Sequence, residues 1–448
     1  MVSEKLRKLQ TERKRDFETL SDLIWDNPEL RYREFKSSSL QKEFLMKEGF
    51  SVTSPIAGIE TAFVAEKGKG GSVIAFCGEF DALPGLSQKA DVSIPDPVTE
   101  GGPGHGCGHN LLGVGCLEAA VLTAALLEES GMEGRVRYYG CPAEESGAGK
   151  AFMVRAGVFD DVDIAIAWHP GPMSAVMNNS LANVRVIYEF YGKAAHAASH
   201  PQVGRSALDA LELCNVGANF LREHVIQEAR IHYAILDSGG NAPNVVQPYA
   251  KEIYALRAPR ITQVGEILER MNDVARGAAL MTGTTVRISV VSAYANLMPN
   301  DTLDRLMLSN ANEIWPLEYT EEEKEYARRF LRKDDPESVE SSFLQTTKIP
   351  PMASTDFGDV SWVVPSTGLS GCCYAKGSIL HSWAVTAQGK SDVAHKGMHA
   401  SALAMAATAL DLFSDSSLIE KAKRDHRKTL GGEEYRSLIP DDVEPGSF

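Results

Sequence analysis

Short apolar runs separated by a long apolar helix form the first clear pattern in the chain. Residues 71–80 (GSVIAFCGEF), Arg135 to Cys141 and Asp163 to Trp168 are runs of the length and composition of buried strands. Between the first two lies LLGVGCLEAAVLTAALLEES, which predicts a helix with Asn110 as its N-cap. Because strands alternate with helices, we expect an α/β domain: an open mixed sheet with helices on both faces and polar motifs at the strand ends.

The pattern changes near Asn183. From there the order is strand (VRVIYEFYG), helix (SALDALELCNVGANFLREHV), strand (IHYAILDSG), strand (AKEIYALRAP), helix (QVGEILERMNDVARGAAL) and strand (TVRISVVSAY). This βαββαβ order predicts a ferredoxin-like α+β domain inserted into the larger domain. We therefore expect residues 1–183 and 297–448 to form the main domain and residues 184–296 the insertion. An alanine-rich final helix is expected from His399 to Phe413.

Composition narrows the class of protein. The net charge is −15 and acidic residues are spread along the chain, so nucleic acid is not an expected partner. Hydrophobic residues make up 44% and no apolar run is long enough for a bilayer, so we expect no membrane association. The charged N-terminal segment lacks the apolar core of a signal peptide, and seven irregularly spaced cysteines indicate reduced thiols. A cytoplasmic location fits these features.

Residue types that bind metals occur in four distant segments, each at a predicted strand end or in a loop. The segments are GHGCGHN with His105, Cys107 and His109, PAEES with Glu144 and Glu145, AWHPG with His169, and ILHSW with His381. Thiolate and imidazole suit zinc or manganese, and one of two adjacent glutamates can bind a metal while the other holds a water. Each segment alone could be a buried thiol, a solvated glutamate pair or an ordinary strand-end histidine. The four together indicate a metal site.

Taken in order, the motifs resemble the aminoacylase and carboxypeptidase-like family of metallopeptidases, in its amidohydrolase branch. The resemblance covers nearly the whole chain. It runs from NPELRYREFKS (27–37) through GEFDALPGLS, GPGHGCGHNLLGVG, CPAEESGAGK, WHPG, GKAAHAASHPQVGRSALDA, GNAPNVVQP and STDFGDVSWVVP to HSWAVTAQGKSDVAHKGM. Several motifs in the same order identify the family with high specificity. They identify the substrate less well, because substrate choice depends on the shape of the pocket.

The resemblance implies a dinuclear metal centre, with two divalent ions (Mn or Zn) in each subunit. Its expected ligands are Cys107, His109, Glu145, His169 and His381. Either Glu145 or Cys107 is expected to bridge the two ions. His395, in AHKGM, is the alternative to His381 for the last metal position.

Three further carboxylates are interpreted through the resemblance. Glu144 is expected to be the general base, which takes a proton from the attacking water and then protonates the leaving amine. Asp81 is expected to orient a metal ligand by a hydrogen bond on the side of that ligand that faces away from the metal. Glu79 stands where many relatives have a histidine ligand, and a structural role is favoured over a sixth ligand position.

The inserted domain is expected to act as a lid and dimerisation domain. His196 is expected to stabilise the oxyanion in an active site, often that of the partner subunit. Asn244 with Arg257 or Arg260 is expected to bind a substrate carboxylate, although both arginines could equally be surface charges at a strand end. The resemblance thus implies a homodimer through the inserted domain, or pairing with a homologous subunit.

The expected function is metal-dependent hydrolysis of the amide bond in a small N-acyl or aminobenzoyl amino acid. One alternative uses the same dinuclear site as a dipeptidase or as a hydrolytic deaminase of an aromatic amine. Another is a partner-dependent subunit of a heteromeric hydrolase, and a third is a ligand-binding regulator. The full ligand set together with Glu144 favours an enzyme over a binding module.

Overall fold

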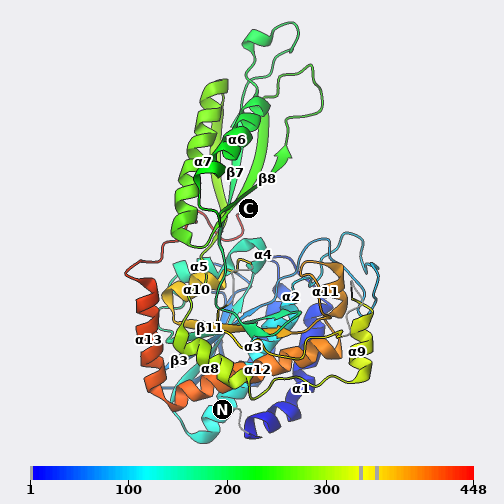
Figure 1. Ribbon diagram of the computed structural model, residues 1–448, viewed down its shortest axis with the longest axis vertical. Helices are drawn as coiled ribbons and strands as arrows, with labels where there is room; N and C mark the ends of the chain where they lie inside the picture. The colour runs from blue at the N-terminus through cyan, green and yellow to red at the C-terminus, as the bar shows by residue number, and fades with distance from the viewer. Residues whose placement is uncertain (1–3, 332–336, 349–352, 448) are drawn as a thin grey trace. The chain divides into compact units, whose positions relative to one another are not determined.

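The computed structural model describes residues 4–331, 337–348 and 353–447, which form two compact units (Figure 1). Unit 2 consists mainly of Ser180–Asn296, drawn largely in green in Figure 1, and unit 1 is built from the chain before and after it. Unit 2 also takes in residues 353–358 and 436–447, which the sequence pattern had placed with the main domain.

Unit 1 is built on a seven-stranded sheet in the order β1-β2-β4-β3-β5-β11-β6. The central strands β4, β3, β5 and β11 are parallel to one another, whereas β1, β2 and β6 pair antiparallel. Every residue of β3 is buried, as expected for a strand whose two faces are both covered. The open mixed α/β sheet is therefore confirmed. The strands are β1 (Ser51–Thr53), β2 (Phe63–Lys69), β3 (Val73–Glu79), β4 (Gly134–Cys141), β5 (Ile164–Gly171), β6 (Ala175–Val176) and β11 (Ser366–Cys372).

Two long apolar helices, α3 and α12, form the centre of the helical layers. Helix α3 contacts β3, β4 and β5 and packs against α12 and α1. It is long and apolar enough to cross a membrane, but 89% of its most apolar window is buried inside the protein. The helices outside unit 2 are α1 (Glu4–Trp25), α2 (Phe35–Lys47), α3 (His109–Ser130), α4 (Glu144–Gly147), α5 (Gly149–Arg155), α8 (Asp301–Ala311), α9 (Glu321–Arg328), α10 (Phe357–Val363), α11 (Trp383–Gln388), α12 (Asp392–Ser414) and α13 (Ser416–Leu430).

Two predicted helix starts are wrong. Helix α3 begins at His109 after Gly108, and the side chain of Asn110 does not cap it but donates to Ser21 Oγ and to the carbonyl oxygen of Gly389. Helix α12 begins at Asp392, seven residues before His399, because the hydroxyl of Ser391 accepts a hydrogen bond from the backbone N–H of Ala394. The alanine-rich composition marked only the later part of this helix.

Unit 2 has a four-stranded antiparallel sheet in the order β10-β7-β9-β8. With its two long helices it has the βαββαβ order of a ferredoxin-like domain, as predicted. Strand β8 lies at the edge of the sheet, and most of its residues are exposed. The elements are β7 (Ala182–Tyr191), η1 (Pro201–Val203), α6 (Ala207–Leu221), η2 (Arg222–His224), β8 (Arg230–Asp237), β9 (Tyr249–Ala258), α7 (Ile261–Thr282) and β10 (Thr285–Tyr294).

A buried ionic cluster joins α1, α3 and α12 in unit 1. Nδ1 of His399 lies 2.9 Å from Oε2 of Glu118, and its Nε2 lies 3.4 Å from Oε1 of Glu18. Burial disfavours the charged imidazole, but Glu118 and Glu18 outweigh this effect and raise the pKa of His399 to about 9. The hydrogen bond with His399 lowers the pKa of Glu18 to about 2. The three helices are thus held together by a charged histidine between two carboxylates.

We expect His399→Gln to destabilise unit 1 by about 3 kcal/mol near pH 6, because removing one member of a buried ion pair leaves the other uncompensated. The folded pKa of about 9 lies above the ordinary value of 6.5, so the stabilisation is full below pH 6.5 and disappears as the pH rises through 9. Urea unfolding at pH 6 and pH 10 measures this difference, with the exposed His224→Gln as control. An equal loss at both pH values would contradict the ionic role.

Candidate metal centre

Cys107 and His109 flank a tight turn at the start of α3. Gly108, between them, has a left-handed φ of 74°. A Cβ at this position would overlap the hydroxyl of Tyr374 and lie 2.8 Å from Cγ of Pro170. Only glycine fits both the backbone conformation and the space, and the turn that it permits brings the Cys107 thiol and the His109 imidazole into one cluster.

Asp81 orients two of the expected ligands. Its Oδ1 lies 2.9 Å from Nδ1 of His109, and its Oδ2 accepts a hydrogen bond from the backbone N–H of Glu145 at 2.7 Å. Because Nδ1 of His109 donates to this carboxylate, Nε2 is left as the nitrogen that can bind a metal. The orienting role that the sequence predicts for Asp81 stays a prediction, and these two contacts are the ones that it needs.

His169 is held by its own strand end. Its Nδ1 lies 2.8 Å from the carbonyl oxygen of Pro170, and its Nε2 lies 3.4 Å from the sulfur of Cys107. Burial lowers the pKa of His169, so the ring is neutral near pH 7, which is the form that binds metals. Strand β5 extends through His169 to Gly171, beyond its predicted end at Trp168.

Glu145 and His381 come from two strained loops. Three non-glycine residues around Glu145 have a left-handed φ: Ala143 (59°), Ser146 (70°) and Ala148 (59°). His381 also has a left-handed φ, of 62°, and its backbone N–H donates to the carbonyl oxygen of Gly106 at 2.7 Å. Its Nε2 lies 3.2 Å from Oε1 of Glu145. Such conformations cost about 1–3 kcal/mol each and tend to cluster where function needs them.

The potential ligand atoms form three overlapping groups, and within each group all atoms lie within 4.8 Å of one another. The first group is Cys107, His109 and His169, and the second is Cys107, Glu145 and His381. The third is Glu79, His109 and Glu144. Because Cys107 belongs to both of the first two groups, the geometry favours this thiolate over Glu145 as the bridge between two ions.

The chemistry of these atoms fits divalent cations. Among the described residues, Nε2 of His109, Oε1 of Glu145 and Oε2 of Glu79 are buried and form no hydrogen bond of good geometry. Their near contacts are those of His109 with Glu79 at 3.3 Å and of Glu145 with His381 at 3.2 Å. A buried polar atom without a partner costs about 1–3 kcal/mol, so three of them in one cluster favour an additional ligand there. Thiolate, imidazole and carboxylate are the donors that zinc and related divalent ions bind.

The charges of the cluster support the same conclusion. Burial opposes ionisation of Glu145, but the close contact with His381 and the charge of His109 lower its pKa to about 2, so it is a carboxylate near pH 7. Burial and then Glu145 raise the pKa of the Cys107 thiol. A cation at the site would reverse this effect and stabilise the thiolate, so that metal binding would release a proton.

Glu79 has two different contacts. Its Oε1 forms an ion pair of 2.7 Å with Lys150, whose side chain is completely buried, and its Oε2 lies 3.3 Å from Nε2 of His109. The sequence analysis did not predict a role for Lys150. Its position shortly after a strand of a buried sheet could have indicated a buried partner for a carboxylate. The structural role predicted for Glu79 stays a prediction, since its second oxygen faces the ligand cluster.

Two histidines weighed from the sequence lie outside the three groups. His105 is buried, its Nε2 lies 3.3 Å from the carbonyl oxygen of Ile24, and burial lowers its pKa to about 3. His395, the alternative to His381, is in α12 with its Nε2 3.0 Å from Asp22. The structure therefore brings His381 and not His395 to the cluster.

The predicted residues of unit 2 lie at opposite ends of its sheet. His196 pairs with Val245, which follows Asn244, next to the end where Tyr191 pairs with Tyr249. Arg257 pairs with Asn183 near the other end of β9, and Arg260 follows that strand. At about 3.3 Å per residue, Tyr249 and Arg257 are about 26 Å apart along the strand. The four residues therefore form two groups, not one.

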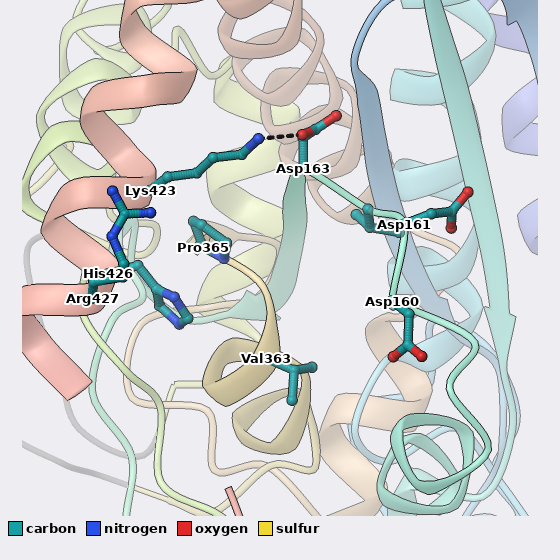
Figure 2. A pocket seen from close by; sticks show the side chains of 9 residues that line it. Asp160, Asp161, Asp163, Val363, Pro365, Lys423, His426 and Arg427 are labelled. Carbon is teal, nitrogen blue, oxygen red and sulfur yellow. Dashed lines mark hydrogen bonds and ion pairs between the residues drawn. The ribbon is translucent and has the colours of Figure 1, made fainter. Parts of the chain in front are cut away.

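A cavity of about 330 Å³ lies elsewhere in unit 1 (Figure 2). Lys423 and Asp163 form an ion pair of 2.5 Å at its wall. None of the residues of the three ligand groups lines this cavity. Its lining consists of Asp160, Asp161, Val162, Asp163, Val363, Pro365, Lys423, His426 and Arg427.

The comparisons with known proteins find relatives along nearly the whole chain and solved structures with a similar fold. No family model matches the chain. The chain is 42% identical to one of the subunits of p-aminobenzoyl-glutamate hydrolase of Escherichia coli (strain K12), covering 98% of this chain and 97% of that protein. It is 32% identical to the Xaa-Arg dipeptidase of Mus musculus, covering 93% and 90%. A dinuclear metal-binding peptidase of the M20 family from Bacillus subtilis has a similar fold, with a TM-score of 0.55, 19% identity and coverage of 89% and 99%.

If Cys107 is shared by two ions, its loss should affect both. We expect the native protein to bind about two divalent ions per subunit, Cys107→Ala to bind fewer than one, and His169→Ala or His381→Ala to retain about one. Metal content after equilibration with zinc or manganese measures this, with the buried Cys116→Ala as control. A Cys107→Ala protein that keeps one tightly bound ion would place the bridge at another residue.

Proposed function

The chain belongs to the aminoacylase and carboxypeptidase-like family of metallopeptidases and amidohydrolases, and from this premise we propose that it hydrolyses the amide bond of a small N-acyl or aminobenzoyl amino acid. The observation that carries the proposal is the convergence of the two ligand groups on Cys107, with Glu144 within reach of His109. A site of this kind would hold a pair of ions next to a carboxylate that can take up a proton, which is what metal-assisted hydrolysis needs.

Two divalent ions, Mn or Zn, held by Cys107, His109, Glu145, His169 and His381, would polarise the amide carbonyl and acidify a water molecule. Glu144 accepts a proton from that water as its oxygen bonds to the carbonyl carbon. The same carboxyl then gives the proton to the amide nitrogen, and the C–N bond breaks. An amine and a carboxylic acid leave, and the acid loses its remaining proton to solvent. Asp81 holds His109 and Glu145 in place throughout.

The relatives support the substrate class. Hydrolysis of p-aminobenzoyl-glutamate is named for the relative at 42% identity, which favours an aminobenzoyl or acyl amino acid. The Xaa-Arg dipeptidase at 32% identity supports a dipeptide as the second candidate, cleaved by the same chemistry. In either case Asn244 and one of Arg257 and Arg260 are proposed to bind the carboxylate of the substrate. Because Asn244 and the arginines lie at opposite ends of the sheet, the two contacts would have to come from different subunits.

Activity of the native protein and loss of activity in Glu144→Gln test the proposed function. We expect the variant to lose about 10²-fold to 10⁴-fold in kcat, because the glutamine side chain cannot accept the proton, while its metal content stays native. Amine release from a panel of N-acyl amino acids, aminobenzoyl amino acids and dipeptides measures this with zinc-loaded and manganese-loaded protein. Absence of turnover by metal-loaded native protein on every substrate would favour the partner-dependent subunit.

His196 is proposed to stabilise the oxyanion in the active site of a partner subunit. Its Nδ1 accepts hydrogen bonds from the backbone N–H groups of Ala198 and Ser199 at 3.2 Å, so the neutral ring carries its proton on Nε2 and can donate from there. The imidazole is exposed. His196 and the arginines lie at opposite ends of the sheet, which favours their serving two different sites.

We propose a homodimer through unit 2, because apolar residues are exposed at the β8 edge of its sheet. Tyr233, Ile235 and Leu236 of the edge strand β8 are 42%, 50% and 52% exposed, and Phe220 of α6 is 69% exposed. An edge strand with apolar side chains is suited to pairing with the same strand of a second subunit. Pairing with a homologous subunit, as the name of the relative at 42% identity implies for that protein, would use the same edge.

Mixing two inactive variants tests whether His196 acts across the dimer. We expect His196→Gln alone to lose about 10²-fold in kcat. When His196→Gln and Glu144→Gln chains are denatured and refolded together, a mixed dimer has one intact site, so about a quarter of native activity should return.

No recovery in a sample that contains mixed dimers would show that His196 acts within its own subunit. Sedimentation velocity and mass spectrometry establish the dimer and its mixed composition. Refolding each variant alone is the control, and neither sample should regain activity.

A further inference from the structure

The segment that carries Glu144 and Glu145 would not hold its conformation by itself. Within residues 143–148, Ala143, Ser146 and Ala148 all have a left-handed φ, which side chains other than glycine avoid. Helix α4 spans only four residues, and Glu145 inside it has non-helical backbone angles. Contacts from outside are needed to keep this backbone in one position.

Those contacts come largely from one short stretch of the N-terminal region, residues 31–34 (RYRE). Nη1 of Arg31 donates to the carbonyl oxygen of Ser146 at 2.8 Å, and the hydroxyl of Tyr32 donates to the carbonyl oxygen of Gly147 at 2.6 Å. On the other side of the glutamates, Oε1 of Glu34 accepts a hydrogen bond from the backbone N–H of Ala143 at 2.9 Å. The two glutamates therefore lie between contacts made by a single segment.

Segment 31–34 is itself fixed. Glu34 is completely buried, its Oε1 also accepts from the backbone N–H of Tyr32 at 2.8 Å, and its Oε2 accepts from the hydroxyl of Thr61 at 2.9 Å. Leu30 pairs with Ala82, the residue after Asp81. The segment is thus connected both to the loop that orients His109 and to the backbone that carries Glu144 and Glu145.

The ring of Tyr32 adds a packing contact. A Cβ on Gly147 would lie 3.0 Å from Cε2 of Tyr32, so the ring packs directly against the glycine. A change from Tyr32 to phenylalanine keeps this packing and removes only the hydroxyl that donates to Gly147. The effect of the hydrogen bond can therefore be separated from that of the ring.

We infer that Tyr32 and Glu34 are positioning residues of the reaction, which hold segment 143–148 so that Glu145 reaches its ion and Glu144 reaches the attacking water. This inference rests on the proposed function of the two glutamates. It assigns a role in catalysis to the NPELRYRE motif, which the residues of the metal centre leave unexplained. Contacts of this kind, one step removed from the ligands, commonly change metal affinity or activity by about 10-fold to 100-fold.

The test compares Tyr32→Phe and Glu34→Leu, which removes the oxygen that accepts from Ala143, with Tyr139→Phe. Tyr139 is a matched control, because its hydroxyl also donates to a backbone carbonyl in unit 1, that of Val158 at 2.8 Å, and neither residue belongs to the ligand groups or to segment 143–148. We expect both test variants to lose about 10-fold or more in kcat with KM within about twofold, because misplacement affects the reaction more than binding. Calorimetric titration of the metal-free proteins with zinc should show weaker binding of one ion, and Tyr139→Phe should match the native protein in both assays.

Native kcat, KM and zinc affinity in both test variants would overturn the inference, even if their thermal stability fell, since segment 31–34 would then only stabilise the fold. If Glu34→Leu does not fold, Tyr32→Phe decides alone. The zinc titration needs no substrate, so it tests the positioning role even if native protein hydrolyses nothing in the panel, an outcome that would count against the proposed function only.

Discussion

The carboxylate of Asp81 is the constraint on which the geometry of the candidate metal centre depends. One oxygen holds the imidazole of His109 and the other holds the backbone of Glu145, so two ligands from separate segments share one support. Asp81 is 1% exposed and lies two residues after the end of β3, whose residues are all buried. Its position is thus set by the core of the sheet, and the ligands take their positions from it.

The sheet explains why these groups meet. Strand β3 lies between β4 and β5, and all three are parallel. Their carboxyl ends therefore lie along one edge, where Asp81, the two glutamates and His169 follow or end the three strands. Left-handed residues are concentrated at the same edge. The regular sheet provides the positions, and the strained loops direct the side chains inward.

Much of the fold could be predicted because strands and helices leave local patterns of apolar residues. Such patterns predicted the βαββαβ order of unit 2 and the long helix α3. The start of α3 could not, because Gly108 makes the turn while the side chain of Asn110 contacts Ser21 and Gly389, which are distant in sequence. The motifs predicted which residue types bind metal. That Cys107 belongs to two ligand groups, and that Lys150 pairs with Glu79, depends on distances between segments that no local pattern contains.

The insertion of unit 2 also divides the metal centre in the order in which the chain is synthesised. Cys107, His109 and His169 all precede Ser180, so one ligand group is complete before the ribosome has made unit 2. The other group needs His381, and the sheet needs β11, both of which follow unit 2. Since domains fold in the order of their synthesis, the second ion position can form only after about two hundred further residues have been translated. The candidate site that includes His381 therefore belongs to the finished protein alone, although its other ligands are made before unit 2.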